Sequence, residues 1–308
     1  MDAMQVAVAA AGLWTAPDAA RALDAPALDN PVRLNEWVKA QGPAERRDLW
    51  GRLDSQVLLG DTVLVDDVKE GWAQVVVPSQ PGRKDPRGYP GWIPATQLAA
   101  PATGSDRAAV VHVPRSRVHA GPGGSVIIED VSYATVFPVL GEHDGWVKVA
   151  LPGGGHGWVA GRHLSAYNRI LPTAQQLLGD GRRFLGLMYL AGGGTGCGLD
   201  CSGLTWAVYR RFGQVIPRDA TDQYAIGDAV ELTDLAAGDL MFFRKPDTGF
   251  VYHVGICAGV TDGWPSMLHC SQTDWDTLDG PISEVRMGHL FAARRFRASP
   301  TGVDPSRG

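Results

Sequence analysis

The sequence predicts a multidomain protein in which two small all-β barrels precede an α+β domain, and three observations lead to this fold class. First, the segment 71–78 (GWAQVVVP) recurs as 145–152 (GWVKVALP). Second, each copy is followed by another Gly-Trp strand, at Gly91 and at Gly157. Third, the pattern after residues 171–172 changes to helical spacing followed by short strands. Helices followed by a sheet are typical of an α+β domain.

The domain map follows from these patterns. We expect a first barrel at residues 1–103, a second barrel at 104–168 and the α+β domain at 169–308. The first barrel is predicted to carry a mostly helical insertion, because Leu34, Trp37 and Val38 fall at helical spacing before strands resume at residue 56.

The two repeats differ in one hairpin. Pro78 and Gly91 are 13 positions apart, whereas Pro152 and Gly157 are 5 apart, so the hairpin of the first repeat is 8 residues longer. We call residues 78–91 the long hairpin. It contains charged and aromatic residues that the second repeat lacks.

Length and charge limit the function classes. The chain has 308 residues, enough for about two or three domains with their own cores. A net charge of −5 argues against a nucleic-acid partner, which needs a basic face. The apolar segment 6–13 is too short to cross a bilayer, and no basic residue precedes Arg21, so no export signal is predicted. We expect a cytoplasmic monomer without a membrane partner.

The cysteines are too few for a disulfide scaffold in a chain of this length, so we expect reduced thiols. They are Cys197, Cys201, Cys257 and Cys270. With His253 and His269 they include the ligand types of a zinc site. However, no Cys-x-x-Cys pair is present, and strand periodicity places His269 and Cys270 on opposite faces. We therefore predict neither a metal nor a cofactor.

One cysteine lies at the predicted start of a helix. The glycine-rich segment 192–198 leads to Cys201, and Leu204, Val208 and Phe212 follow at helical spacing. The positive end of the helix dipole and its free N–H groups favour a thiolate, so we expect a lowered pKa for Cys201. These features predict a nucleophile whose oxyanion the same N–H groups stabilise.

A general base is expected from a strand further along the chain. In the segment 252–256, a period of two places His253 on the face opposite the apolar Val254 and Ile256. Its imidazole is well placed to reach a neighbouring helix terminus. His269 lies on another short strand and could orient the first imidazole.

The chain at this point resembles the NlpC-type peptidases through five motifs in the family's order. They are Asp200-Cys201-Ser202-Gly203-Leu204, Pro217-Arg218-Asp219-Ala220 with Gln223, Gly238-Asp239-Leu240-Met241-Phe242-Phe243, His253-Val254-Gly255-Ile256 and Leu268-His269. The resemblance implies a papain-like fold and cleavage between γ-D-glutamate and an L-diamino acid, lysine or diaminopimelate, in peptidoglycan stem peptides. It also implies Cys201 as nucleophile, His253 as base and His269 as the third catalytic member. Tyr189 would line the site, although Ala191 stands where the family usually has tryptophan.

The two barrels resemble bacterial SH3-type domains, and the combination resembles a subgroup that trims peptides beginning with L-Ala-γ-D-Glu. In that subgroup a tyrosine and an acidic residue of the first barrel, with the aspartate before the cysteine, bind the free amine of L-alanine. The resemblance implies Tyr89 and Asp200 for two of these roles. We choose Asp61 as the acidic residue, with Asp54 as the second choice. Ser202 is also expected to bind the peptide.

The resulting prediction is a cysteine endopeptidase of the dipeptidyl-peptidase type, which acts on stem peptides with a free N-terminal L-alanine in murein peptide recycling. Two alternatives remain open. The chain could be a catalytically weak protein that only binds wall peptides, although the complete Cys-His-His set weighs against this. The same fold could also support an amidase or an acyltransferase, which would differ in the acceptor of the acyl group.

Overall fold

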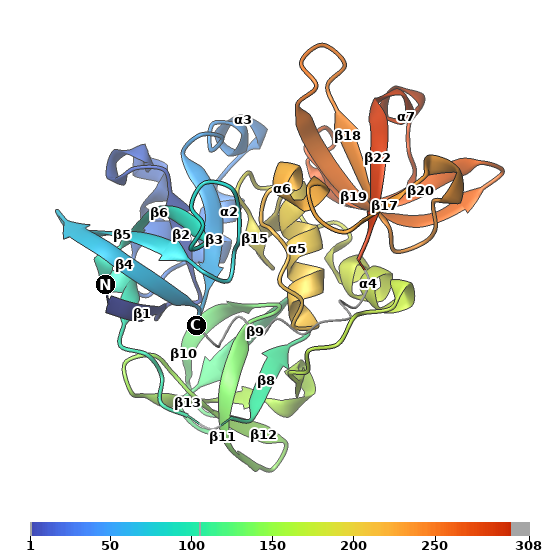
Figure 1. The fold of residues 1–308 in the computed structure, drawn as a ribbon. Coiled ribbons are helices and arrows are strands. Elements are labelled where there is room, and N and C mark those ends of the chain that lie inside the picture. The colour runs from blue at the N-terminus through green and yellow to red at the C-terminus, as the bar shows by residue number, and fades with distance from the viewer. Residues whose placement is uncertain (1, 105, 297–308) are drawn as a thin grey trace.

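The computed structural model describes residues 2–104 and 106–296 and confirms the predicted fold class. Two seven-stranded antiparallel sheets form the barrels, and a six-stranded sheet with helices forms the third domain. Helices α5 and α6 lie between the first barrel and the sheet of the third domain (Figure 1). Within the described ranges, no helix is long and apolar enough to cross a membrane.

The first barrel has the strand order β3-β2-β6-β5-β4-β1-β7. Its strands are β1 (Asp2–Val6), β2 (Ala10–Trp14), β3 (Leu53–Leu58), β4 (Thr62–Lys69), β5 (Trp72–Val77), β6 (Tyr89–Pro94) and β7 (Leu98–Ala99). A 3-10 turn, η3 (Ala95–Gln97), precedes β7. The long hairpin joins β5 to β6, and the ladder opens beyond the pair Val77 and Tyr89.

The helical insertion lies between β2 and β3. It consists of the 3-10 turns η1 (Pro17–Ala19) and η2 (Ala22–Asp24) and the helices α1 (Ala25–Leu28), α2 (Leu34–Lys39) and α3 (Pro43–Arg47). Leu34, Trp37 and Val38 of α2 are buried. The Trp37 ring packs against Trp14 of β2 with a centroid distance of 6.5 Å. This apolar face of α2 therefore holds the insertion on its own barrel.

The second barrel has the strand order β10-β9-β13-β12-β11-β8-β14. Its elements are β8 (Ala108–Val111), β9 (Arg115–His119), β10 (Val126–Ser132), β11 (Val136–His143), β12 (Trp146–Ala150), β13 (His156–Ala160), η4 (Gly161–His163) and β14 (Leu164–Ala166). Its interior is a separate small cluster built largely from valines, with Phe137 and with Leu59 from the first barrel.

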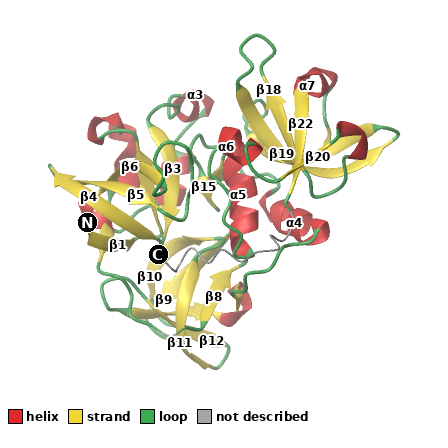
Figure 2. Cartoon of the chain, in the orientation of Figure 1, coloured by secondary structure: helices red, strands yellow, loops and turns green. Residues whose placement is uncertain are grey.

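The third domain begins with α4 (Ala174–Gly181), whose N-cap Thr173 accepts a hydrogen bond from the Gln176 N–H at 3.2 Å. Its sheet has the order β17-β22-β18-β19-β20-β21. Figure 2 shows the strands β18, β19, β20 and β22 of this sheet. The other elements are η5 (Arg182–Phe184), β15 (Gly194–Thr195), β16 (Gly198–Leu199), α5 (Cys201–Arg211), α6 (Ala220–Tyr224), β17 (Asp228–Val230), η6 (Leu232–Asp234), β18 (Leu240–Arg244), β19 (Val251–Thr261), β20 (Trp264–Ser271), β21 (Asp276–Pro281), α7 (Glu284–His289) and β22 (Leu290–Arg295).

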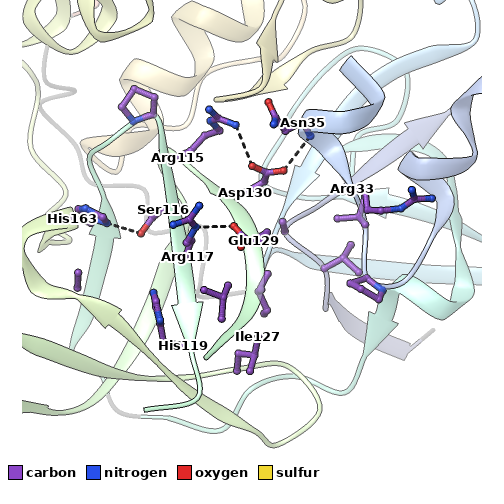
Figure 3. Close-up of a pocket in the computed structure, with 18 of the residues that line it drawn as sticks. Arg33, Asn35, Arg115, Ser116, Arg117, His119, Ile127, Glu129, Asp130 and His163 are labelled. Carbon is purple, nitrogen blue, oxygen red and sulfur yellow. Dashed lines mark hydrogen bonds and ion pairs between the residues drawn. The ribbon is translucent and has the colours of Figure 1, made fainter. Parts of the chain in front are cut away.

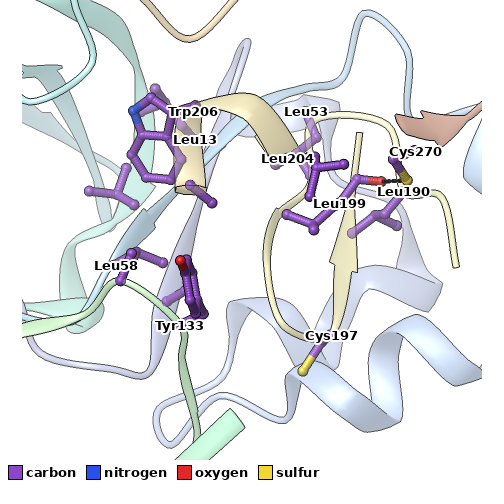
Figure 4. Packing of buried hydrophobic residues seen from close by; sticks show 14 of the residues in the cluster. Leu13, Leu53, Leu58, Tyr133, Leu190, Cys197, Leu199, Leu204, Trp206 and Cys270 are labelled. Carbon is purple, nitrogen blue, oxygen red and sulfur yellow. Dashed lines mark hydrogen bonds between the residues drawn. The ribbon is translucent and has the colours of Figure 1, made fainter. Parts of the chain in front are cut away.

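One hydrophobic core joins the first barrel to the third domain. Leu13 and Leu58 of the barrel belong to the same cluster as Leu204 and Trp206 of α5 (Figure 4). Burial of each such side chain stabilises the fold by about 1.5–3 kcal/mol. The buried residues that the second barrel contributes to this cluster are Tyr133 and Ala134. The first barrel and the third domain are thus packed as one body, which fixes the barrel's position beside α5.

Candidate active site

Cys201 is the first residue of α5, and the surrounding motif is explained by the way this helix begins. The N-cap Asp200 accepts a hydrogen bond from the Gly203 N–H through Oδ1 at 2.6 Å. A Cβ atom at position 203 would lie only 2.1 Å from the carbonyl oxygen of Gly193. Glycine is therefore required where the helix start passes the preceding loop.

The Cys201 thiol is buried, with 7% of the residue exposed. Burial and the neighbouring Asp200 carboxylate raise the pKa of Cys201 to about 12. The backbone N–H groups of Val254 and Ser202 and the Arg218 cation oppose this rise but do not overcome it. The lowered pKa expected from the helix dipole is therefore wrong for this site. A thiol in this state needs a base to remove its proton before the sulfur can act as a nucleophile.

The two predicted histidines lie in contact beside the helix start. His253 Nε2 is 2.9 Å from His269 Nδ1, and the two rings meet edge to face at 86°. Val254, which hydrogen-bonds to the Cys201 sulfur, follows His253 directly in β19. Among the described residues, the buried His253 Nδ1 has no hydrogen-bond partner. This nitrogen is therefore free to accept a proton.

Glycine at position 255 leaves space for the two imidazoles to contact each other. Gly255 is two positions from His253 in β19 and lies beside β20, which carries His269. A Cβ atom at position 255 would be 2.3 Å from Met267 Sδ and 3.0 Å from His269 Cβ. Glycine at this position thus leaves room for the His269 ring beside its cross-strand neighbour.

Arg218 links the helix start to the first barrel. Its guanidinium is fully buried and donates to Asp200 Oδ1 at 3.0 Å and Oδ2 at 2.8 Å. It also donates to Ser202 Oγ at 3.1 Å and to Ser55 Oγ of β3 at 3.0 Å. Two ionic hydrogen bonds to one carboxylate fix the geometry on both sides of Cys201. Arg218 thus holds Asp200 and Ser202 on either side of Cys201, and their expected contact with the peptide stays a prediction.

Tyr89 comes from the long hairpin and reaches the third domain. Its hydroxyl donates to Asp219 Oδ2 at 2.8 Å. Burial and the nearby Asp219 and Asp54 carboxylates raise the pKa of Tyr89 well above its ordinary value, so the phenol stays protonated. Lys84 Nζ lies 4.5 Å from the Tyr89 ring centroid and donates to Asp54 Oδ2 at 2.7 Å. We call Asp54, Tyr89 and Asp219 the amine corner.

Asp61 is placed differently from the prediction. Its carboxylate forms a buried ion pair with Arg210 of α5 and accepts from the Leu58 N–H at 3.3 Å. These contacts satisfy the carboxylate within the interface between the first barrel and α5. The placement contradicts an amine-binding role beside Tyr89 and favours Asp54, the second choice. The sequence could not separate the two, because both aspartates belong to the same stretch of the barrel.

Tyr189 lies beside Cys201, and a part of the insertion covers it. Burial and the neighbouring Cys201 and Asp200 side chains raise the pKa of Tyr189 well above its ordinary value. Trp50 and Trp275 meet the Tyr189 ring edge-on at centroid distances of 6.5 and 5.8 Å. The aromatic rings around Tyr189 thus include Trp50 of the helical insertion, a region that the sequence analysis did not connect to the site.

Three other residues near the site were not assigned a role from the sequence. Arg218 and Asp219 were noted only as part of a motif, although adjacent opposite charges before a short helix could have signalled a polar network. Arg286 of α7 lies 3.3 Å from His269 Nδ1 through Nη1. No motif marks it, because its position depends on how α7 packs on the sheet.

A cavity of about 1160 Å³ lies elsewhere, between the insertion and the second barrel. Its lining includes Asn35, whose N–H donates to Asp130, and Arg115 and Arg117, which pair with acidic neighbours (Figure 3). No residue of the Cys201 site lines it. Over the described ranges, no three His, Cys, Asp or Glu side chains are grouped to hold a metal ion.

Comparison with known proteins places the chain in a family. Residues 186–288 match the model of the NlpC/P60 family. The chain is 37% identical over 303 residues to a γ-D-glutamyl-L-lysine dipeptidyl-peptidase of Bacillus cereus, a match that covers 94% of this chain and 89% of the relative. The chain belongs to the NlpC/P60 family. A dipeptidyl-peptidase of the same name from Bacillus subtilis is 36% identical and covers 86% of this chain and 88% of its own length.

The likeness to this NlpC/P60 family extends to the barrels. Residues 118–167 match the model described as the YKFC SH3b2 domain. The crystal structure of an NlpC/P60 family protein from Bacillus cereus superposes with a TM-score of 0.87 at 34% identity, covering 96% of this chain and 99% of that one. The predicted resemblance to NlpC-type peptidases with SH3-type barrels is therefore confirmed.

Proposed function

We propose that this NlpC/P60 protein is a cysteine peptidase that hydrolyses the bond between γ-D-glutamate and an L-diamino acid in peptides with a free N-terminal L-alanine. The names of its two Bacillus relatives support this substrate class. The observation that carries the proposal is the amine corner, in which Tyr89 of the first barrel donates to Asp219 of the third domain and Asp54 lies near Tyr89. Arg218 connects this corner to Asp200, the residue before Cys201.

The catalytic step follows from the geometry around the thiol. As Cys201 attacks the γ-carbonyl carbon of D-glutamate, its proton passes to the free Nδ1 of His253. Backbone N–H groups at the start of α5 stabilise the oxyanion. The C–N bond then breaks, and the amine of the diamino acid leaves with the proton from His253. Water, deprotonated by the same imidazole, cleaves the thioester and restores the thiol.

The amine corner supplies groups suited to an ammonium ion. Two carboxylates and a phenol oxygen can accept its hydrogen bonds, each ionic one contributing about 1.5–3 kcal/mol. Lys84 supports this assignment, because its own ammonium already lies between the Asp54 carboxylate and the Tyr89 ring. A substrate amine would take the place of this partly exposed ammonium or share its carboxylate.

Selection for a free amine determines which peptides can be substrates. An acylated alanine offers a neutral amide with a single N–H and added bulk, so it cannot satisfy the same carboxylates. Intact wall peptides, whose alanine is acylated by the sugar lactyl group, would therefore be poor substrates. We accordingly propose peptide fragments as substrates and murein peptide recycling as the process.

The test compares two peptides. We expect L-Ala-γ-D-Glu-diaminopimelate, or its lysine counterpart, to give L-Ala-γ-D-Glu and the free diamino acid by mass spectrometry. The N-acetylated peptide should react at least about a hundredfold more slowly. Equal cleavage of both would refute the free-amine proposal alone. Cleavage of neither, by a folded protein, would refute the peptidase assignment for these substrates.

A further inference from the structure

A cation lies against the third member of the proposed catalytic set. Arg286 Nη1 is 3.3 Å from His269 Nδ1, the same nitrogen that contacts His253 Nε2 at 2.9 Å. Arg286 comes from α7, where the Ser283 side chain accepts its backbone N–H at 3.2 Å, and its guanidinium packs over the Phe243 ring. In the part of the chain that the structure describes, no carboxylate forms an ion pair with Arg286.

The chemistry of arginine decides where the protons of the histidine pair reside. A guanidinium can donate hydrogen bonds but cannot accept them, and it does not lose its proton in proteins. A proton on His269 Nδ1 would point at this cation, so Nδ1 must carry the lone pair. The short contact to His253 then requires the hydrogen on His253 Nε2. This leaves His253 Nδ1 unprotonated, and that atom is the one without a partner.

We propose that Arg286 is a positioning residue that fixes the tautomers of both histidines, so that His253 presents an unprotonated Nδ1 to Cys201. The opposite arrangement would place the hydrogen on His253 Nδ1 and remove the base. The role of Arg286 depends on peptidase chemistry at Cys201 but not on recognition of a free substrate amine.

The charges around His269 support the same conclusion. Burial and Arg286 lower the pKa of His269 to about 3, and Asp274, in the turn after β20, opposes them. His253 faces it from β19, and Cys201 and Asp200 lie at the start of α5. His269 therefore remains a neutral acceptor at the pH values where most hydrolases work. If the cation is removed, the pKa values of His269 and His253 both rise toward the ordinary value.

Three variants separate the possible roles of this side chain. Arg286→Met removes the donor and the charge, Arg286→Gln keeps an N–H donor without the charge, and Arg286→Lys keeps both. We expect kcat/KM of Arg286→Met to fall about 10- to 100-fold at pH 7, since the base contributes about 10²–10⁴ in total. The acidic limb of its kcat/KM–pH profile should move to higher pH. Arg286→Lys should restore much of the rate and much of the wild-type position of this limb. Arg244→Met is the matched control, because Arg244 lies over Phe291 of the same sheet.

Nitrogen-15 NMR of the imidazoles provides a readout that a purely structural role would not change. The eight histidines of the chain can be assigned with His253→Gln and His269→Gln spectra. In the wild type we expect His253 protonated at Nε2, and in Arg286→Met a mixture of the two tautomers. An unchanged tautomer and an unchanged acidic limb in folded Arg286→Met and Arg286→Gln would overturn the proposal, whatever the loss of activity.

Discussion

Each barrel places a tyrosine hydroxyl against an aspartate of the third domain, but the two contacts have different surroundings. In the first barrel, Tyr89 donates to Asp219 at 2.8 Å beside Arg218 and the start of α5. In the second, Tyr133 donates to Asp180 of α4 at 2.9 Å, and its ring packs edge-on against Phe184. The first contact lies near the start of α5, whereas the second lies beside Phe184 and the ion pairs of Asp180 with Arg183 and Arg211.

The difference comes from a loop and not from the barrel fold. Both repeats use the same strand order, but only the first has the long hairpin that carries Lys84 and Tyr89. That hairpin is also attached to α6, because the Arg83 N–H donates to Asp222 at 3.0 Å. A duplicated module can thus provide a binding surface in one copy and support in the other.

The largest effect should separate binding from chemistry. Cys201→Ala is expected to lower turnover by about 10³-fold or more, because no other group can form the thioester. The amine corner is untouched, so the dissociation constant for L-Ala-γ-D-Glu should stay within about threefold of wild type by isothermal titration calorimetry. Loss of this binding would show that recognition does not reside in the barrel contact.

Arg218→Met should damage both the site and the fold. The substitution leaves the Asp200 carboxylate buried without its cation, which costs about 3–5 kcal/mol of unfolding free energy. We expect kcat/KM to fall by about a hundredfold as the start of α5 loses its connection to Ser55. Urea unfolding and steady-state kinetics measure the two effects. Unchanged stability would contradict the assigned role of this guanidinium.

Tyr89 and Tyr133 allow matched substitutions in the two barrels. Tyr89→Phe should reduce kcat/KM for the free-amine peptide about tenfold, with a smaller change for the acetylated one. Tyr133→Phe should cost about 1 kcal/mol of stability and leave both kinetic constants unchanged. Equal kinetic effects in the two variants would remove the distinction between the barrels.

The pH dependence should not distinguish the barrels at all. Burial, His269 and Arg286 hold the pKa of His253 well below its ordinary value, so the base stays unprotonated until the pH falls below that lowered pKa. We expect kcat/KM of the wild type to show no loss near pH 6.5, the ordinary titration point of histidine. Tyr89→Phe and Tyr133→Phe should share this profile. A loss centred near pH 6.5 would contradict the buried geometry of the pair.

The sequence predicted those parts of the molecule that local patterns determine. The Gly-Trp repeats indicated both barrels, and glycine-rich sequence before Cys201 indicated the helix start. The pairing of His253 with His269 followed from strand periodicity and the family motifs. The predicted lowering of the Cys201 pKa was wrong because the helix-dipole argument omitted burial, which only the packed structure reveals. The predicted role of Asp61 was wrong because its ion-pair partner, Arg210, lies 149 positions away in the sequence and is brought close only by folding.

Asp54 is the residue of the first barrel through which we propose that a free substrate amine is selected. The direct measurement is the ratio of kcat/KM for free and N-acetylated L-Ala-γ-D-Glu-diaminopimelate in Asp54→Asn. Asp66→Asn is the control, because this carboxylate of the same barrel binds Arg87 at 2.8 Å outside the amine corner. We expect the ratio to fall about tenfold or more in Asp54→Asn and to stay at the wild-type value in Asp66→Asn. A wild-type ratio in both variants would contradict the claim.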